Sequence, residues 1–227
     1  YLVWTKKPLQ ALRHEEMRYY LGIILGAILL ITINIRGSFH SLLDAVHHAA
    51  FQVASIITTT GYSTADFNQW PEFSKFVLVL LMFVGACAGS TGGGIKVSRI
   101  VIMLKLMKNE LSYLIHPKRV RQIHFEKHVV NKDVLRSISV FFIAYAVVYG
   151  ASVLFISLDE LDFTTNFTAV AATLNNIGPG LGQVGPAENF AVYSQPAKYV
   201  LMFDMLAGRL ELFPILLLFT PSTWKRR

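Results

Sequence analysis

Residues 53–61 read VASIITTTG, and residues 170–178 read VAATLNNIG. When Gly61 is aligned with Gly178, the Val-Ala pairs near the start of the two stretches also coincide. In both stretches an apolar segment gives way to polar residues and a glycine, which is typical of a helix that ends in irregular backbone. The sequence therefore predicts an internal repeat centred on two short helices and the polar segments that follow them.

The helices before these glycines are too polar or too short to cross a membrane. Residues 38–57 contain three histidines, an aspartate and a glutamine, and residues 163–174 form a segment of only about twelve residues, whereas a spanning helix needs about 20 mostly apolar residues. Irregular backbone at membrane depth persists only where protein or a water-filled cavity satisfies it. We therefore predict two re-entrant half helices, each followed by a polar segment, at residues 58–64 and 175–182.

Longer apolar runs flank each half helix and predict membrane spans. The chain is 53% hydrophobic and 15% charged, with a mean hydropathy of +0.47, whereas about a quarter of a typical soluble domain is charged. The predicted spans are residues 19–35, 76–87, 134–158 and 199–219. The fold class that follows is an all-α integral membrane protein made of tandem span–pore helix–filter–span repeats.

The net charge of +7 fits membrane topology better than nucleic-acid binding. Residues 96–136 carry ten of the 21 lysines and arginines, and further basic residues precede the first span and end the chain. In the segments between the spans on the other side, most of the charged residues are acidic. Under the positive-inside rule this pattern places both termini and the central loop, residues 116–131, in the cytoplasm. That loop could be plain solvated chain, or it could dock an acidic regulator or lipid head groups.

The polar segments allow two interpretations. Thr58 to Ser63 read TTTGYS and Asn175 to Gly180 read NNIGPG, which are both good turn sequences. They also suit a selectivity filter, in which backbone carbonyls replace the hydration shell of a cation and a glycine allows the required backbone angles. The C-terminal ends of the half helices carry partial negative charge and favour a nearby cation. Because the arrangement occurs twice, we favour the filter.

The segment from Gly85 to Gly94, GACAGSTGGG, has five glycines in ten residues. Each interior glycine costs a helix roughly 1 kcal/mol, so we expect a loop inside the membrane rather than a continuous span. A phosphate-binding P-loop is the alternative, but Ile95 stands between Gly94 and Lys96 and an apolar helix precedes the segment. Close helix packing through Gly85 and Gly89 is compatible with a loop that begins just afterwards.

Three further features are weaker signals. Cys87 is the only cysteine, which excludes an intramolecular disulfide and a cysteine-based zinc site. His47 and His48 are adjacent and diverge on a helix, so we expect hydrogen-bonded side chains rather than metal ligands. No signal peptide is readable before the first span, and Tyr1 begins as though within a longer protein.

Arg209 is expected inside the last span, where an arginine costs at least about 2.5 kcal/mol on insertion scales. It lies near Asp204 and Glu211 in the sequence. One interpretation is a structural ion pair with one of these residues, or a contact with helix-end carbonyls. The other places the guanidinium in the cavity below the filter, where it repels a cation and sets a barrier.

The chain resembles the last two of four repeats in the Trk/Ktr/HKT superfamily of potassium-uptake proteins, and most of all the bacterial TrkH type. The resemblance rests on TTTGYST, GACAGSTGGGIK, NNIGPG and AGRLELFPILLLFTPSTWKR in this order and spacing, and it covers essentially the whole chain. In that family four non-identical repeats surround one pseudo-fourfold pore, so this chain would form half of it. The resemblance implies a third repeat at residues 1–115, a cytoplasmic loop at residues 116–131 and a fourth repeat at residues 132–227.

The resemblance also implies roles for individual residues. The potassium-binding filter residues are Thr59, Thr60, Gly61, Asn176, Ile177 and Gly178. The gate is an intramembrane loop formed by Gly89, Ser90, Thr91, Gly92, Gly93 and Gly94. An arginine at the position of Arg209 lies in the conduction pathway, and potassium is the transported ion, with no other metal and no cofactor on this chain.

The implied function is potassium uptake across the bacterial inner membrane, not an enzymatic reaction. The implied partners are a TrkA-type cytosolic nucleotide-binding regulatory subunit, a second copy in a homodimer and the lipid bilayer, but no nucleic acid. Two alternatives stay open: a sodium-coupled or sodium-selective relative, and a membrane nucleotide-binding enzyme that uses the glycine-rich segment.

Overall fold

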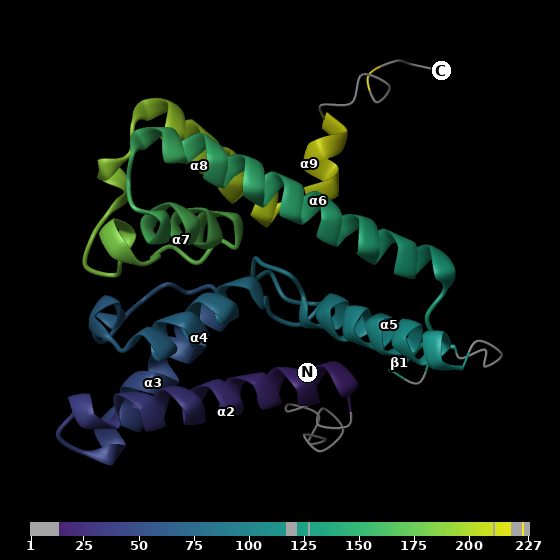
Figure 1. The fold of residues 1–227 in the computed structure, drawn as a ribbon, viewed down its shortest axis with the longest axis horizontal. Coiled ribbons are helices and arrows are strands. Elements are labelled where there is room, and N and C mark those ends of the chain that lie inside the picture. The colour runs from purple at the N-terminus through teal and green to yellow at the C-terminus, as the bar shows by residue number, and fades with distance from the viewer. Residues whose placement is uncertain (1–13, 117–121, 127, 211, 219–223, 225–227) are drawn as a thin grey trace.

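A computed structural model describes residues 14–116, 122–126, 128–210, 212–218 and 224. Several residues used in the sequence analysis therefore lie outside the described part of the chain. They are the basic residues that precede position 14, Glu211, and four basic residues of the central loop, Lys118, Arg119, Arg121 and Lys127. The described residues form a helical fold with one small hairpin (Figure 1).

The N-terminal unit contains one long helix, one half helix and a broken second span (Figure 1). Its elements are α2 (Glu15–Ile35), η1 (Arg36–Ser38), α3 (Leu42–Ile57), η2 (Phe67–Gln69), α4 (Glu72–Phe83) and α5 (Val97–Ile115). The half helix α3 begins later than expected because residues 36–38 form a 3-10 turn and Ser41 caps the helix, accepting a hydrogen bond from the amide of Asp44 (3.1 Å).

The C-terminal unit repeats this order after an antiparallel hairpin, and the two units lie one above the other in Figure 1. The hairpin strands are β1 (His124–Phe125) and β2 (His128–Val129). The unit itself consists of α6 (Lys132–Ile156), η3 (Ser157–Asp159), α7 (Phe163–Leu174), η4 (Gly182–Val184), η5 (Phe190–Val192), α8 (Gln195–Arg209) and α9 (Leu212–Leu218). The half helix α7 has the predicted bounds.

The two long helices have the length and surface of membrane spans. The most apolar 18-residue stretches of Glu15–Ser38 and Lys132–Asp159 have mean hydropathies of 1.8 and 2.2, yet only 22% and 17% of these stretches are buried within the chain. Large apolar side chains such as Leu25 on α2 and Leu154 on α6 point outward, with 66% and 75% of their surfaces exposed. A soluble fold would bury these surfaces, so they face lipid.

One predicted span is wrong in detail. The sequence favoured a single helix from about Pro196 to Phe219, but α8 ends at Arg209 and α9 begins at Leu212. In Figure 1 the chain turns sharply between these helices. The last span is therefore interrupted, although by a much shorter break than the one between α4 and α5.

The two units share an aromatic contact at the end of α4. The ring of Phe83 lies 5.4 Å from that of Tyr149 and 6.1 Å from that of Phe167, measured between ring centres. Phe83 and Tyr149 each pack against the buried cores of both units. Such aromatic pairs add to the stabilisation from burial alone, so the units meet immediately before the glycine-rich segment.

The cap of α7 provides a test of this architecture. Asp162 accepts hydrogen bonds from the amide and hydroxyl of Thr165 (2.9 and 2.5 Å), which lowers the pKa of its carboxyl. We expect Asp162→Ala to reduce the free energy of unfolding by about 1 kcal/mol, while Asp162→Asn, which keeps an acceptor, retains most of it. Thermal unfolding in detergent measures both.

Because this pKa is lowered in the folded state, the carboxylate stabilises the fold above its unfolded pKa of about 3.9 and that contribution is lost as the pH falls through the folded value. The difference in melting temperature between wild type and Asp162→Ala should therefore shrink in strong acid. A difference that stays constant below pH 3 would contradict the assignment of the cap.

Candidate ion filter and gate loop

The polar segments after α3 and α7 have the same backbone hydrogen bonds. The amide of Thr60 donates to the carbonyl of Ser55 (2.9 Å), and the amide of Ile177 donates to the carbonyl of Ala172 (2.8 Å). The two preceding amides in each segment follow the same pattern, with the pairs Thr58–Ala54, Thr59–Ile56, Asn175–Ala171 and Asn176–Thr173. The aligned positions of the two repeats are therefore structurally equivalent.

Backbone angles repeat in the same way. The φ angle is 56° at both Thr59 and Asn176, and it is 80° at Gly61 and 112° at Gly178. A positive φ is unusual for any residue with a side chain and a genuine outlier for a β-branched threonine. Such strain costs on the order of 1–3 kcal/mol per residue and is concentrated at functional sites.

The two segments lie against each other and border a common cavity. A side chain at Gly61 would collide with the carbonyl oxygen of Ile177. A cavity of about 570 Å³ is lined by residues of both segments and by residues of the C-terminal unit, including Thr59, Thr60, Asn176, Ile177, Gly178, Thr173, Leu201, Met202 and Met205. Five of the six predicted filter residues thus border one space, and Gly61 packs directly behind Ile177.

Side chains support these segments from behind. The hydroxyl of Ser55 donates to the carbonyl of Tyr62, and the hydroxyl of Thr58 lies 2.8 Å from that of Thr60. In the other repeat, the buried hydroxyl of Tyr145 on α6 donates to the side-chain oxygen of Asn175 (2.9 Å). Hydroxyls therefore support the first segment, and a tyrosine–amide pair supports the second.

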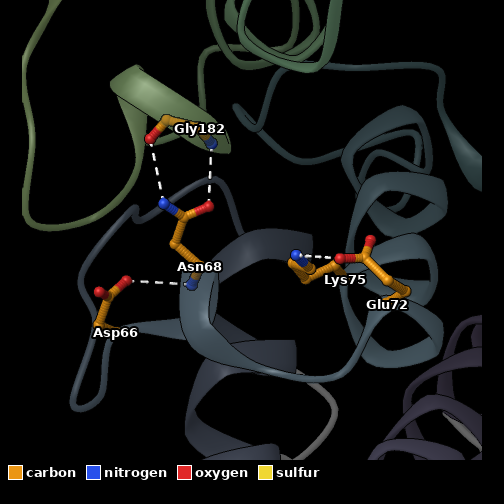
Figure 2. Close-up of polar contacts among 5 residues, drawn as sticks. All are labelled: Asp66, Asn68, Glu72, Lys75 and Gly182. Carbon is orange, nitrogen blue, oxygen red and sulfur yellow. Dashed lines mark hydrogen bonds and ion pairs between the residues drawn. The ribbon is translucent and has the colours of Figure 1, made fainter.

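Asn68 joins the two repeats beyond the filter segments (Figure 2). Its side-chain nitrogen donates to the carbonyl of Gly182 (3.1 Å), and the amide of Gly182 donates to its side-chain oxygen (2.9 Å). Asp66 orients this turn by accepting from the amide of Asn68 (3.0 Å). The ion pair between Lys75 and Glu72 lies at the start of α4 and is not part of the contact between Asn68 and Gly182. Sequence reasoning missed Asn68 because its partner is 114 residues away.

The glycine-rich segment is a loop, as predicted. Helix α4 ends at Phe83 and α5 begins at Val97, with no helix between them. The neck of the loop is closed by backbone bonds: the amide of Gly85 donates to the carbonyl of Ile95 (2.8 Å), and the amide of Ile95 donates to the carbonyl of Phe83 (3.2 Å). We call residues 85–96 the gate loop below.

The gate loop lies against the first residues of both filter segments. A side chain at Gly92 would contact the hydroxyl of Thr59, and one at Gly93 would collide with the carbonyl of Asn175. On its other side a cavity of about 120 Å³ is lined mainly by the loop, α6 and the end of α8, including Ser90, Thr91, Gly92, Gly94, Lys96, Tyr145, Gly208 and Arg209. The loop thus adjoins the filter segments on one side and this cavity on the other.

Two cationic side chains hold the gate loop by its carbonyls. The guanidinium of Arg209 donates to the carbonyl of Thr91 (2.7 Å). The ammonium of Lys96 donates to the carbonyls of Gly92 (2.6 Å) and Ser90 (3.0 Å). Charge-assisted bonds of this kind are about twice as strong as neutral ones, so they fix a segment in which five of the twelve residues are glycines.

Arg209 does not pair with Asp204, one of the two acidic residues suggested as its partner. Asp204 is fully buried and accepts a hydrogen bond from the hydroxyl of Ser152 (2.8 Å). The structure describes both Asp204 and Arg209, and no ion pair joins them. The other suggested partner, Glu211, lies outside the described residues.

Comparison with known proteins identifies this arrangement. Residues 23–226 match the family model of TrkH, described as a cation transport protein. The chain belongs to the TrkH family. It is 40% identical over 215 residues to the Trk system potassium uptake protein TrkH of Salmonella typhimurium, a match that covers 94% of the chain and 44% of that protein. A Halomonas elongata TrkH is 35% identical over 228 residues, or 100% of the chain and 47% of that protein.

The structural match is equally extensive. The crystal structure of the potassium transporter TrkH from Vibrio parahaemolyticus superposes with a TM-score of 0.89 at 39% identity, covering 96% of the chain and 47% of that protein. The chain therefore spans about half the length of these TrkH relatives, and the resemblance seen in the sequence is confirmed at the level of family and fold.

Gly208 tests how closely α8 approaches the filter of this TrkH family member. A side chain there would collide with the carbonyl of Leu174 at the end of α7, whereas one at Gly150 on α6 meets nothing within 4 Å. We expect Gly208→Ala to lower the free energy of unfolding by about 1–3 kcal/mol through overpacking. Gly150→Ala, the matched control, should be neutral or stabilising by up to about 1 kcal/mol. Thermal unfolding in detergent compares them, and equal melting temperatures would contradict the close approach.

Proposed function

We propose that the two filter segments form half of a potassium-selective pore that carries potassium into the cell. The observation that supports this is the matched pair of strained backbones, with a positive φ at Thr59 and Asn176 and again two residues later at Gly61 and Gly178. Alternation of left-handed with other residues turns successive carbonyls toward one side, as a cation filter requires. The positive φ and the backbone bonds at Thr59 and Asn176 match a common cap of helix C-termini. The second positive φ, at Gly61 and Gly178, is the part of the match that goes beyond such a cap and supports a shared role.

A cation is the ligand that the surroundings favour. Helices α3 and α7 both end at the filter segments, and helix C-termini carry partial negative charge. The filter residues that border the larger cavity supply carbonyls, hydroxyls and an amide, which are oxygen ligands suited to an alkali cation, whereas the rest of the lining is mostly apolar and includes Lys198. Sodium-selective or sodium-coupled transport is the alternative. We favour potassium because the relatives are named as potassium uptake proteins and a potassium transporter.

We further propose that the chain supplies the third and fourth of four repeats. Residues 1–115 would form the third, residues 116–131 a cytoplasmic loop and residues 132–227 the fourth. The matched hydrogen bonds after α3 and α7 support this division, as does the coverage of 44–47% of the relatives. A complete filter would then need two more strands from the rest of the protein.

The gate loop is proposed to close the pathway below the filter. It lies against Thr59 and Asn175, and its small residues bury little apolar surface, so its position depends mainly on the hydrogen bonds from Arg209 and Lys96. Arg209 would act in two ways, as a fixed positive charge in the pathway and as the group that holds Thr91. The nucleotide-binding alternative has less support, because helix α4 rather than a strand leads into the glycines.

We propose that the protein lies in the bacterial inner membrane, with the central loop, residues 116–131, and both termini of the chain on the cytoplasmic side. The start of α2, the second half of α5 and the hairpin meet at one end of the fold, where Lys105 pairs with Glu15 and donates to the carbonyl of His124 (2.8 Å). This cluster of basic segments fits the positive-inside rule. The proposed partners are a TrkA-type cytosolic regulatory subunit and a second copy of the transporter.

Gly178→Ser tests the filter. Gly178 has a φ of 112° but open space around it, so a serine fits sterically and acts mainly by forcing its carbonyl to turn. We expect discrimination between potassium and sodium to fall at least about tenfold, a loss of about 1.4 kcal/mol. Gly61→Ser should also lower protein yield, since its side chain would collide with Ile177. Isotope flux into proteoliposomes measures ion preference, and an unchanged preference in folded Gly178→Ser would refute the filter.

Arg209→Ala tests the gate. At an effective dielectric constant of about 20 and about 7 Å, a fixed charge repels potassium by on the order of 2 kcal/mol, so its removal should raise flux more than tenfold. Loss of the bond to Thr91 acts in the same direction. Arg209→Lys keeps the charge but not the fork geometry and should show a smaller rise. Reduced flux at normal yield in Arg209→Ala would mean that the arginine is not a barrier.

A further inference from the structure

Glu16, near the start of α2, touches both ends of the gate loop. A single carboxylate oxygen of Glu16 accepts a hydrogen bond from the amide of Ala88 (2.8 Å) and another from the amide of Ser98 (3.2 Å). Ala88 lies in the first part of the loop, and Ser98 is the second residue of α5, which continues from the loop. The residues between these amides are thus tethered to α2 at both ends.

The second of these bonds supplies a cap that α5 otherwise lacks. Helix α5 begins after Lys96, which forms no side-chain capping bond, and its first turn contains no acidic residue. The free amides and the dipole of a helix N-terminus favour a carboxylate there. Glu16 meets this need from a different helix, so the start of α5 depends on the position of α2.

The start of α2 is capped in the same way by the cytoplasmic hairpin. The residue before α2, His14, forms no side-chain capping bond. Instead one carboxylate oxygen of Glu126, between strands β1 and β2, accepts a hydrogen bond from the amide of Glu16 (3.1 Å), while the other lies 3.2 Å from the ring nitrogen of His14. The hairpin is therefore linked to the gate loop through Glu16 of α2, in addition to the contact between Lys105 of α5 and the carbonyl of His124.

We propose that Glu16 is a positioning residue of the gate loop and links it to the cytoplasmic hairpin through Glu126. In this arrangement, Glu126 holds the start of α2, and Glu16 holds the loop in the position where it lies against the filter. A displacement of the hairpin loosens the carboxylate from Ala88 and Ser98. The inference rests on the proposed gate and adds to it the contact through which the cytoplasmic side acts on the loop.

Cys87 provides a readout of loop position that does not depend on ion flux. It is a half-buried free thiol directly before Ala88. We expect Glu16→Ala to raise the rate of its modification by a water-soluble maleimide about tenfold, because two bonds to a charged acceptor are lost. Mass spectrometry of the Cys87 peptide from the full-length transporter in proteoliposomes gives this rate. It is followed across pH and the plateau rates are compared, so that loss of the Glu16 charge beside the thiol does not by itself change the readout.

Two conservative variants separate positioning from general stability. Glu16→Gln keeps an acceptor oxygen without the charge and should raise labelling less than Glu16→Ala. Glu15→Gln is the matched control, since Glu15 lies in the same helical turn but pairs with Lys105 of α5, and labelling should stay at the wild-type rate. Glu126→Ala should raise labelling by a smaller factor than Glu16→Ala, because it acts through α2.

Resting potassium flux measured on the same samples distinguishes the failure of this inference from failure of the proposed function. We expect flux to rise with Cys87 labelling across these variants, with a variant lacking residues 89–93 as the reference for an open gate. If that deletion raises flux but Glu16→Ala and Glu16→Gln leave both labelling and flux at wild-type values, Glu16 does not position the loop. If the wild type carries no potassium, the proposed function fails, while the labelling rates still test whether Glu16 positions the gate loop.

Discussion

Backbone groups at membrane depth must find partners inside the protein, because lipid offers none. The filter segments and the gate loop are irregular segments between helices, and each finds its partners differently. The filter amides bond back to the last turn of the preceding half helix. The gate loop depends instead on charged side chains from three elements, Arg209, Lys96 and Glu16, which bind its carbonyls and amides.

This difference in partners makes the two irregular segments depend on different parts of the fold. The backbone bonds of each filter segment lie within its own repeat, so they do not depend on the positions of α2 and α8. The gate loop is bonded to α2 and α8, and these bonds break when those helices shift. In the proposed pore, this arrangement lets the loop move while the filter keeps its geometry.

The sequence predicted the parts of the fold that local chemistry determines. Polarity and length identified the half helices, and glycine content identified the break before α5. The break after Arg209 was missed although Pro214, in the first turn of α9, marks it: proline has no amide hydrogen to donate to the carbonyl of Leu210, and its ring clashes with that carbonyl. Asn68 and Glu16 were missed for a different reason: their partners are 114 and at least 72 residues away, and nothing near them in the sequence marks the contact.

The two filter segments have the same backbone but unlike side chains, with threonines and a tyrosine around Gly61 and asparagine, isoleucine and proline around Gly178. In a pore made of identical subunits, every substitution changes all sides of the ion site at once. In the proposed pore a substitution changes one side only, and the opposite side retains its geometry. Ion preference can therefore drift in small steps during evolution, with each mutation adjusting a fraction of the coordination shell while the remainder keeps the pathway working.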